Sequence, residues 1–387
     1  MICIHKTPDV VDKLTILSQD SKYDLACACC TRKDEHRVRS ADHKWIYPVI
    51  MPNGRKTFLF KTLVSNACVN NCKYCPLRVG ADPRRCTLTA EETVRTFLEY
   101  RQAGMVDGIF LSSGVTGSPD ATMDRINTIA RVLRQKHEFK GYIHLKVIPG
   151  ASDGAINEAV SLATAVSCNI ETAGEKHFRQ LCTSKNYLED VIRPIKRIGQ
   201  LTAEGSRFEK VKQTTQFVVG ASDETDRELV QYSWGLYQRL GMHRIYFSAY
   251  QRGAGAADLP GEHGTQNNAD LLTREHRLYQ VDWLIRKYGF SETQIPFESG
   301  GNLSLISDPK EIWARHHPEF FPLDINRAGK FDLLKVPGLG PRTVGLILRA
   351  RYEGRQIRHI EDLGPRGKRL QKAEGYLKFG ERVSLFE

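Results

Sequence analysis

The sequence predicts an α/β fold on a parallel sheet, followed by a small all-α C-terminal domain. Six short apolar runs alternate with longer amphipathic stretches between residues 57 and 250. Strand and helix patterns in such succession predict a parallel sheet with crossover helices, either an open doubly wound sheet or a barrel. Pro318 and Pro322 then interrupt the chain before a basic final region, which we expect to fold separately.

The predicted strands are short and mostly apolar, as in a sheet buried on both faces. They are residues 57–65, 108–113, 142–148, 166–171, 213–219 and 244–250. The helices predicted between them include Glu91–Gln102, Thr122–Gln135 and Glu224–Leu240, where apolar positions recur at helical spacing. Further along the chain, Ser307-Asp308-Pro309 predicts the start of another short helix.

Four of these strands carry polar residues at alternate positions, which places them on one face of the sheet. They are His144 and Lys146, Asn169 and Glu171, Thr214 and Gln216, and Tyr246, Ser248 and Tyr250. Buried polar groups often bond only to one another, but the recurrence in four strands favours a chamber lined for a ligand over a packed barrel core.

Three cysteines follow the first predicted strand in the spacing C-x3-C-x2-C, at Cys68, Cys72 and Cys75. A [4Fe–4S] cluster normally takes four cysteine ligands. Three ligands therefore leave one iron open, and an open metal position is where chemistry takes place. The alternative is zinc, but zinc requires a fourth ligand, and Cys86 lies eleven residues further on with no histidine between.

The C-terminal region carries a second motif, in which residues 333–344 lead into the helical run Gly345–Arg351. Two helical stretches joined by P-G-x-G can bring backbone N–H groups close to a phosphate, because glycine has no side chain and a helix start favours an anion. The candidate DNA-binding residues are Gly338, Gly340, Arg342, Thr343, Arg349 and Arg351. A second, degenerate hairpin is predicted at Asp362–Tyr376, and the alternative is that such motifs serve packing or protein docking.

Positive charge is concentrated in this region. Residues 325–387 hold 14 Lys/Arg against 7 Asp/Glu, a net charge of +7, whereas the whole chain carries +11. This surplus favours a polyanionic partner over a solvated helical tail.

The N-terminal residues resemble no signal peptide, and no apolar stretch is long enough to span a membrane. We therefore expect a cytoplasmic protein without a membrane partner. The ten cysteines then indicate metal binding or free thiols rather than disulfides.

With both motifs on one chain, the sequence resembles the radical S-adenosylmethionine (SAM) proteins that carry a C-terminal helix-hairpin-helix and are described as DNA modification or repair enzymes. The resemblance extends over nearly the whole chain and includes residues 108–115, 141–151, 216–228 and 274–290. It implies a partial (β/α)6 barrel with a helix-hairpin-helix domain. The implied parts are an N-terminal extension (1–56), the barrel (57–300), a linker with a helix (301–324) and the helix-hairpin-helix domain (325–387).

The resemblance also implies the cofactors, a [4Fe–4S] cluster held by the three cysteines of the motif and SAM bound beside it. The implied cofactor-binding residues are Tyr74, Ser112, Ser113, Gly114, Lys146, Asn169, Glu171, Gln216 and Gly220. Tyr74 and Gly220 would lie near the adenine, and Lys146 near the SAM carboxylate or the substrate. At Ser112-Ser113-Gly114, serines replace the glycine-glycine-glutamate usual in the family, so the resemblance supplies no carboxylate there to pair with the methionine amine.

The other cysteines allow several interpretations. Cys27, Cys29, Cys30 and Cys86 would hold a second iron–sulfur cluster or a zinc ion if they came together, although C-x-C-C fits no common metal motif. One of Cys86, Cys168 or Cys182 would otherwise serve as a hydrogen donor to a substrate radical, or all three are buried spectators.

The predicted function is that of a radical SAM enzyme, which generates a 5′-deoxyadenosyl radical and acts on a base or sugar of DNA. A duplex base would have to be flipped out or already unpaired to reach the barrel interior. A reducing electron donor such as flavodoxin or ferredoxin is implied, and no catalytic residue is assigned. The alternatives are an RNA-modifying radical SAM enzyme and a non-catalytic iron–sulfur protein that binds DNA.

Overall fold

The computed structural model describes residues 8–21, 45–50, 56–365 and 367–380. The chain divides into two compact units. The first comprises Met1–Glu224 and Gly235–Glu275, and the second comprises Thr225–Trp234 and His276–Glu387. Each unit is described by itself.

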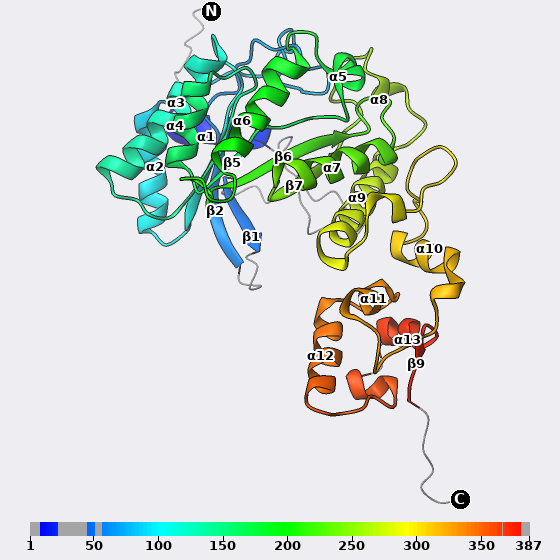
Figure 1. Cartoon of the computed structure of the whole chain (residues 1–387). Helices are drawn as coiled ribbons and strands as arrows, with labels where there is room; N and C mark the ends of the chain where they lie inside the picture. Colours follow the sequence, from blue (N-terminus) through cyan, green and yellow to red (C-terminus); the bar gives the residue numbers. More distant parts are fainter. Residues whose placement is uncertain (1–7, 22–44, 51–55, 366, 381–387) are drawn as a thin grey trace, which may run out of the picture. The chain divides into compact units, whose positions relative to one another are not determined.

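The first unit is built on a seven-stranded sheet whose order follows the chain. Its strands are β1 (Ile46–Ile50), β2 (Lys56–Leu63), β3 (Gly108–Ser112), β4 (Tyr142–Lys146), β5 (Ala165–Ser167), β6 (Lys212–Val219) and β7 (Arg244–Ala249). Strands β2 to β7 run parallel, and β1 is antiparallel to β2. Among the described strands, β1 and β7 are not paired, so the sheet is a partial barrel (Figure 1). This confirms the predicted α/β class and the six parallel strands.

The sequence did not predict β1. Pro48 lies within it, and a proline argues against a strand because it cannot donate to the ladder. The edge position of β1 in the described sheet explains why Pro48 is tolerated.

Among the described residues, one helix precedes the sheet, and the others follow strands β2 to β7. They are α1 (Val10–Asp20), α2 (Ala90–Gln102), α3 (Pro119–Arg131), α4 (Asp153–Leu162), α5 (Glu175–Leu181), α6 (Arg193–Leu201), α7 (Asp226–Leu240), α8 (Pro260–His263) and α9 (Asn268–Tyr288). The side-chain hydroxyls of Thr89, Ser118 and Ser152 accept backbone N–H bonds at the starts of α2, α3 and α4, which fixes where these helices begin.

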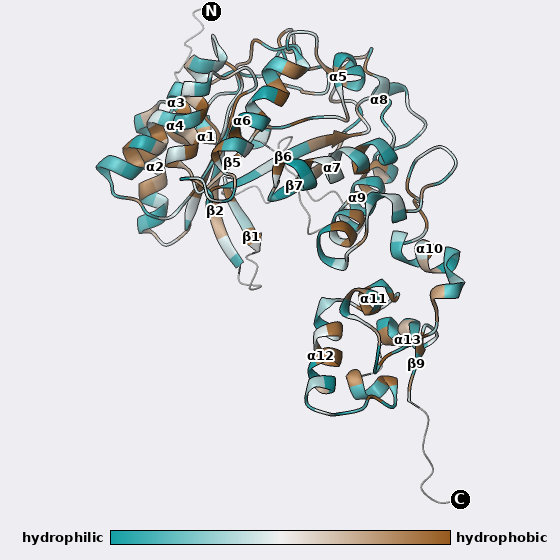
Figure 2. Cartoon of the chain, viewed as in Figure 1, coloured by the Kyte–Doolittle hydropathy of each residue, from teal (hydrophilic) through white to brown (hydrophobic). Residues whose placement is uncertain are grey.

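The two faces of the sheet differ in chemistry. Phe60, Ile109 and Ile143 are in register and fully buried on the face that packs against the helices. The ring of Phe60 lies 6.3 Å from that of Phe97 in α2. Helices α2, α3, α4 and α6 form this outer layer (Figure 1), and hydrophobic and hydrophilic residues alternate along them (Figure 2). Side chains alternate between the two faces of a strand, so the strand residues that neighbour Phe60, Ile109 and Ile143 point to the opposite, inner face of the sheet.

The second unit contains α10 (Pro309–His316), α11 (Lys330–Lys335), α12 (Pro341–Tyr352) and α13 (Lys368–Glu374). As predicted, Asp308 begins α10, where its carboxylate accepts the backbone N–H groups of Lys310 and Glu311. A short parallel pair, β8 (Leu323–Asp324) with β9 (Leu377–Lys378), joins the two ends of the region and was not predicted.

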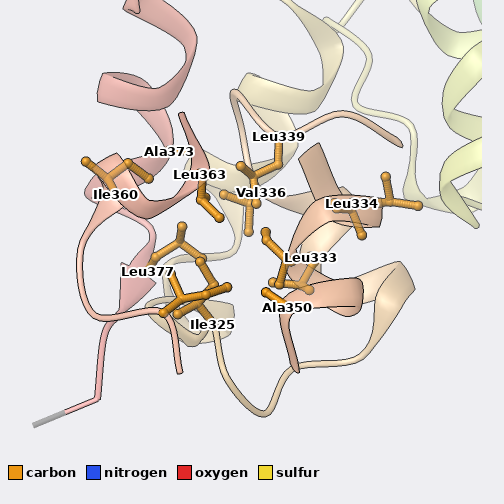
Figure 3. Close-up of a cluster of buried hydrophobic side chains, with 13 residues drawn as sticks. Ile325, Leu333, Leu334, Val336, Leu339, Ala350, Ile360, Leu363, Ala373 and Leu377 are labelled. Carbon is orange, nitrogen blue, oxygen red and sulfur yellow. The ribbon is translucent and has the colours of Figure 1, made fainter. Parts of the chain in front are cut away.

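The core of this region is a compact apolar cluster (Figure 3). Its buried members include Ile325, Leu333, Leu334, Val336, Leu339, Val344, Ile347, Ile360 and Leu377. They come from the residue after β8, from α11, α12 and the turn between them, from the short helix at Ile360–Leu363 and from β9, so residues 325–378 share one core.

None of the helices in the described ranges is both long enough and apolar enough to cross a lipid bilayer.

Candidate active site

The three motif cysteines lie in the loop between β2 and α2, residues 64–89, here called the cysteine loop. The loop is built from turns, with the N–H of Cys75 donating to the carbonyl of Cys72 at 2.9 Å and that of Val79 to Asn70 at 2.8 Å. The thiols of Cys68, Cys72 and Cys75 are all free.

Arg85 holds the cysteine loop in shape. Its guanidinium donates to the carbonyls of Leu77 at 2.9 Å, Ala81 at 3.0 Å and Arg78 at 3.1 Å, and also to that of Asn66. One side chain thus ties both ends of the loop together. Sequence reasoning missed this residue, because an arginine within a basic loop carries no sign of which carbonyls it will meet.

The segment that follows β3 packs directly on the cysteine loop. The N–H of Gly114 donates to the carbonyl of Ser65 at 2.7 Å, and the N–H of Val115 lies 3.4 Å from the Sγ of Cys68. A β-carbon on Gly114 would collide with the carbonyl oxygen of Ala67. The glycine is therefore required where the two segments touch, beside a cysteine of the motif.

Ser112 and Ser113, the other residues predicted here, lie at the carboxyl end of β3. Ser112 is buried, and the hydroxyl of Ser113 donates to the carbonyl of Gly114 at 2.7 Å. The structure thus brings all three predicted residues of this segment to the border of the cysteine loop.

Two further residues flank Cys72: Cys182, which the sequence offered as a candidate hydrogen donor, and Lys185, which it did not assign. The Sγ of Cys182, just after α5, lies 3.6 Å from the Sγ of Cys72. Lys185 lies close enough to Cys72 for the two groups to interact electrostatically. Burial alone would lower the pKa of Lys185, but negative charge at Cys72, Glu171 and Cys182 raises it. Lys185 is therefore a cation held against the motif.

Tyr74 and Glu171 lie close enough together for the charge of Glu171 to act on the Tyr74 hydroxyl. Burial raises the pKa of Tyr74, and the charge of Glu171 adds to this rise. Asn169 donates to Glu171 at 3.5 Å. The predicted residues Tyr74, Asn169 and Glu171 thus lie together.

One detail of that prediction was wrong. Asn169 and Glu171 lie beyond the end of β5, which stops at Ser167. The backbone of Glu171 has φ 68°, a left-handed conformation that costs a residue with a side chain about 1–3 kcal/mol. Hydrogen bonds with Gln216 (3.0 Å) and Val218 (2.7 Å) on β6 hold it there.

The turn after β6 is closed by its own carboxylate. Gly220 has φ 81°, and its N–H donates to Glu224 at 2.7 Å. Arg274 lies 3.6 Å from the same carboxylate. Burial raises the pKa of Glu224, and the charge of Arg274 opposes that rise. Glu224 is thus occupied in shaping the turn that presents Gly220.

The predicted polar face is present. Lys146, Ser167 and Thr214 are in register on β4, β5 and β6, and Gln216 is in register with Tyr246 of β7. They point to the inner face, away from the helices. Lys146 and Gln216 therefore lie on the face that the sequence predicted.

The donor set of the cysteine loop fits a [4Fe–4S] cluster. Burial raises the pKa of the Cys75 thiol to about 11, while a backbone N–H from Leu77 and the charge of Lys185 act in the opposite direction. A bound metal supplies the positive charge that ionises such thiols. In the described part of the chain, no three His, Cys, Asp or Glu side chains converge on one ion position. A cluster needs no such convergence, because each thiolate binds a different iron.

The other cysteines are dispersed. Cys86 points to the carbonyl of Lys13 at 3.8 Å, and Cys168 is buried in the sheet, where burial raises its pKa to about 12. Cys27, Cys29 and Cys30 lie outside the described residues, so a second metal site stays a prediction.

In the second unit, α11 and α12 are joined by the predicted P-G-x-G turn. Gly340 is the residue before α12, and a β-carbon there would meet only the hydroxyl of Tyr288, at 3.6 Å. Gly338 has φ 88°, and a β-carbon there would collide with the carbonyl of Arg369 at the start of α13. Gly340 thus faces open space, whereas Gly338 serves packing inside the unit.

The basic residues of this motif occupy two ends of α12. Arg342 and Thr343 stand in its first turn, with Arg342 exposed. Arg349 and Arg351 are in its last turn, and Arg351 donates to the carbonyls of Ala328 (2.7 Å) and Arg327 (3.3 Å). Nine residues of helix span about 13 Å, so Arg342 and Arg351 cannot address the same phosphate.

Lys310 of α10 stabilises the turn between α11 and α12. Its Nζ donates to the carbonyls of Leu339 at 2.6 Å and Leu334 at 3.1 Å, and lies 4.8 Å from the ring centre of Tyr288. No local pattern in the sequence indicates this contact, since Lys310 is 24 or more residues away from both carbonyls.

Comparison with protein families finds that residues 62–232 match the profile described as the radical SAM superfamily. These residues therefore form a radical SAM domain. Enzymes of this superfamily use a [4Fe–4S] cluster and SAM, which confirms the predicted cofactors. A search of curated proteins finds no match to the chain.

Similar solved structures include HydG, a maturase of the [FeFe]-hydrogenase, with 16% identity over 57% of this chain and a TM-score of 0.44. Methylornithine synthase (PylB) has 12% identity over 58% of this chain and a TM-score of 0.43. The radical SAM methyltransferase TsrM from Kitasatospora setae has 14% identity over 50% and a TM-score of 0.37. The chain spans 48% of HydG, 63% of PylB and 37% of TsrM. These likenesses are too distant to carry an argument about substrate.

Proposed function

We propose that the chain is a radical SAM enzyme that acts on DNA, by modifying or repairing a base or sugar. The observation that carries the proposal is the presence, on one chain, of the radical SAM domain and of a basic unit in which the start of α12 is open at Gly340.

In the first unit, Cys68, Cys72 and Cys75 would hold the cluster, and SAM would lie beside the cysteine loop. Together these groups supply a 5′-deoxyadenosyl radical. The chain's own residues shape the surroundings. Lys185 places a positive charge beside Cys72, the charge of Glu171 acts on Tyr74 and Cys75, and the N–H of Val115 points to Cys68. The proposed SAM contacts are Tyr74, Ser112, Ser113, Gly114, Lys146, Asn169, Glu171, Gln216 and Gly220. Radical SAM enzymes need an electron donor, for which we propose flavodoxin or ferredoxin.

In the second unit, the P-G-x-G turn and α12 would act as a helix-hairpin-helix. The N–H groups of Arg342 and Thr343 are free of a capping side chain, since Gly340 offers none. Such a helix start attracts a phosphate, and the exposed guanidinium of Arg342 adds charge. Arg349 would contact the backbone at the opposite end of the helix.

Two measurements test the proposal. The first is mass spectrometry of nucleosides from the DNA of cells with and without the protein. The second is the affinity of the full chain for duplex DNA across a salt series. Because phosphate contacts release counterions, affinity should fall steeply with salt, and Arg342→Gln should lower the slope by about one unit.

Arg95→Gln, which replaces an exposed arginine of α2, serves as the control. An unchanged set of nucleosides together with salt-independent binding would overturn the proposal. RNA of the same length is the competitor, and clearly tighter binding of RNA would assign the enzyme to the other polymer.

A further inference from the structure

The inner face of the barrel sheet carries a continuous band of cations and aromatic rings. This inner band consists of Lys61, Phe110, Tyr142, His144, Arg244 and Tyr246. Lys61, Phe110 and His144 are in register on β2, β3 and β4. The Nζ of Lys61 lies 4.7 Å from the ring centre of Phe110, whose ring centre lies 4.3 Å from that of His144.

The band continues across the sheet to β7. The Nε2 of His144 lies 3.0 Å from the hydroxyl of Ser167, and Ser167 is in register with Thr214, which is in register with Arg244. Arg244 lies 5.2 Å from the ring centre of Tyr246. Burial and the nearby Tyr246 raise the pKa of Tyr142 on β4. The band therefore links β2 to β7.

The charged side chains of the inner band are positive. Lys61 is buried and Arg244 half-buried, and no aspartate or glutamate stands among the inner-facing residues of β2, β3, β4, β6 and β7. The Nε of Arg244 is buried and has no hydrogen-bond partner among the described residues. A buried donor without a partner costs about 1–3 kcal/mol, and an anion that accepts the hydrogen bond of Arg244 would remove this cost.

We propose that the inner band binds a single nucleotide unit, with its phosphate on Arg244, with Lys61 adding positive charge to the same face, and with its planar base against the aromatic rings of the band. An anion accepts the hydrogen bond from Arg244 and balances the positive charge of the band, and a planar ring stacks on its aromatic side chains. A nucleotide carries both groups on one molecule. The inference rests on the proposed function and names the part of the DNA that would enter the barrel.

The position suits this role. Lys61 precedes the start of the cysteine loop by three strand residues, about 10 Å at the rise of a β-strand. A nucleotide on the band would reach from the middle of the sheet toward the end where the cysteines lie.

The test measures binding of deoxynucleoside 5′-monophosphates and of the matching nucleosides to the reconstituted full chain, by calorimetry. Arg244→Gln should weaken monophosphate binding by about tenfold or more and leave nucleoside binding nearly unchanged, because it removes a charged donor to the phosphate. Lys61→Met should act in the same direction, and Arg244→Lys should recover part of the loss.

The matched control is Arg207→Gln. Arg207 is exposed and stands over Phe208 at the same 5.2 Å as Arg244 over Tyr246. Thermal melting of each variant verifies that it is folded, and Tyr246→Leu provides a second probe that changes no charge. Unchanged monophosphate affinity in folded Arg244→Gln and Lys61→Met, absence of binding, or tighter binding of an aromatic amino acid would each overturn the inference.

Failure here is distinguishable from failure of the proposed function. If the full chain binds and alters DNA but the band variants bind monophosphates normally, only the inference is wrong. If monophosphates bind on the band while DNA is neither bound nor altered, the inference stands and the DNA proposal is wrong.

Discussion

The Sγ atoms of Cys72 and Cys182 lie 3.6 Å apart, although 110 residues separate them in the chain. Cys182 also contacts Asn71 and Ser184 at 3.4 Å each. The hydrogen bond between the two thiols raises the pKa of Cys72 and lowers that of Cys182. A fourth thiol therefore stands against the cysteine motif, and its role can be separated from that of the motif.

We predict that Cys72→Ala abolishes cluster binding and SAM cleavage, because it removes one of three required ligands. Cys182→Ala should retain the cluster, since the motif still supplies three thiolates. The measurements are iron and sulfide content after anaerobic reconstitution and 5′-deoxyadenosine formed from SAM. Full cleavage by Cys72→Ala, or loss of iron from Cys182→Ala equal to that from Cys72→Ala, would refute the assignment of ligands.

Arg85→Met should loosen the cysteine loop. The change removes hydrogen bonds to four carbonyls, and bonds from a charged donor contribute about 1.5–3 kcal/mol each. We expect faster loss of iron to a chelator, by about tenfold or more, because a loop less firmly held releases its cluster more readily. Arg84→Met, at the exposed neighbouring position, is the control and should behave as wild type. Equal rates of iron loss in the two variants would contradict the role given to Arg85.

The two glycines of the C-terminal turn should respond differently to the same small change. Gly338→Ala places a β-carbon against the carbonyl of Arg369 and strains a backbone at φ 88°, so it should destabilise the second unit by about 1–3 kcal/mol. Gly340→Ala has room and should leave stability nearly unchanged. Urea unfolding followed by tryptophan fluorescence measures both, because Trp234, Trp283 and Trp313 lie in this unit. Equal stability of the two variants would show that Gly338 is not a packing residue.

The sequence predicted the elements that depend on local pattern. Ile109 and Phe110 alternate between the two faces of β3, and the Ser307-Asp308-Pro309 cap begins α10 where expected, because both signals lie within a few residues. The spacing of the three cysteines was likewise readable without a structure.

The contacts that give the site its geometry could not be predicted in this way. The left-handed backbone of Glu171 is held by β6, and the carbonyls that Lys310 meets lie 24 and 29 residues away. Each depends on which segments the fold brings together, and no local pattern encodes that.

Lys310 leads to a prediction about pH. Burial lowers its pKa from 10.5 to about 8, against the opposing charges of Asp308 and Glu311. Below about pH 8 the lysine is charged in both the folded and the unfolded chain, and the cost of burying the charge is fully present. Between pH 8 and 10.5 the unfolded chain keeps a proton that the folded chain has lost, so the free energy of unfolding rises with pH.

The stability of Lys310→Met relative to wild type should therefore change across this window, by a few kcal/mol at most, with the wild type gaining as pH rises. Urea unfolding of the full chain at about pH 7.5 and about pH 10, near the two ends of this window, measures the difference in free energy of unfolding between wild type and Lys310→Met. Lys372→Met is the matched control, because Lys372 pairs with Glu311 at the surface of the same unit. A stability difference between wild type and Lys310→Met that is equal at both pH values would show that the lysine is not neutralised by its burial against the turn.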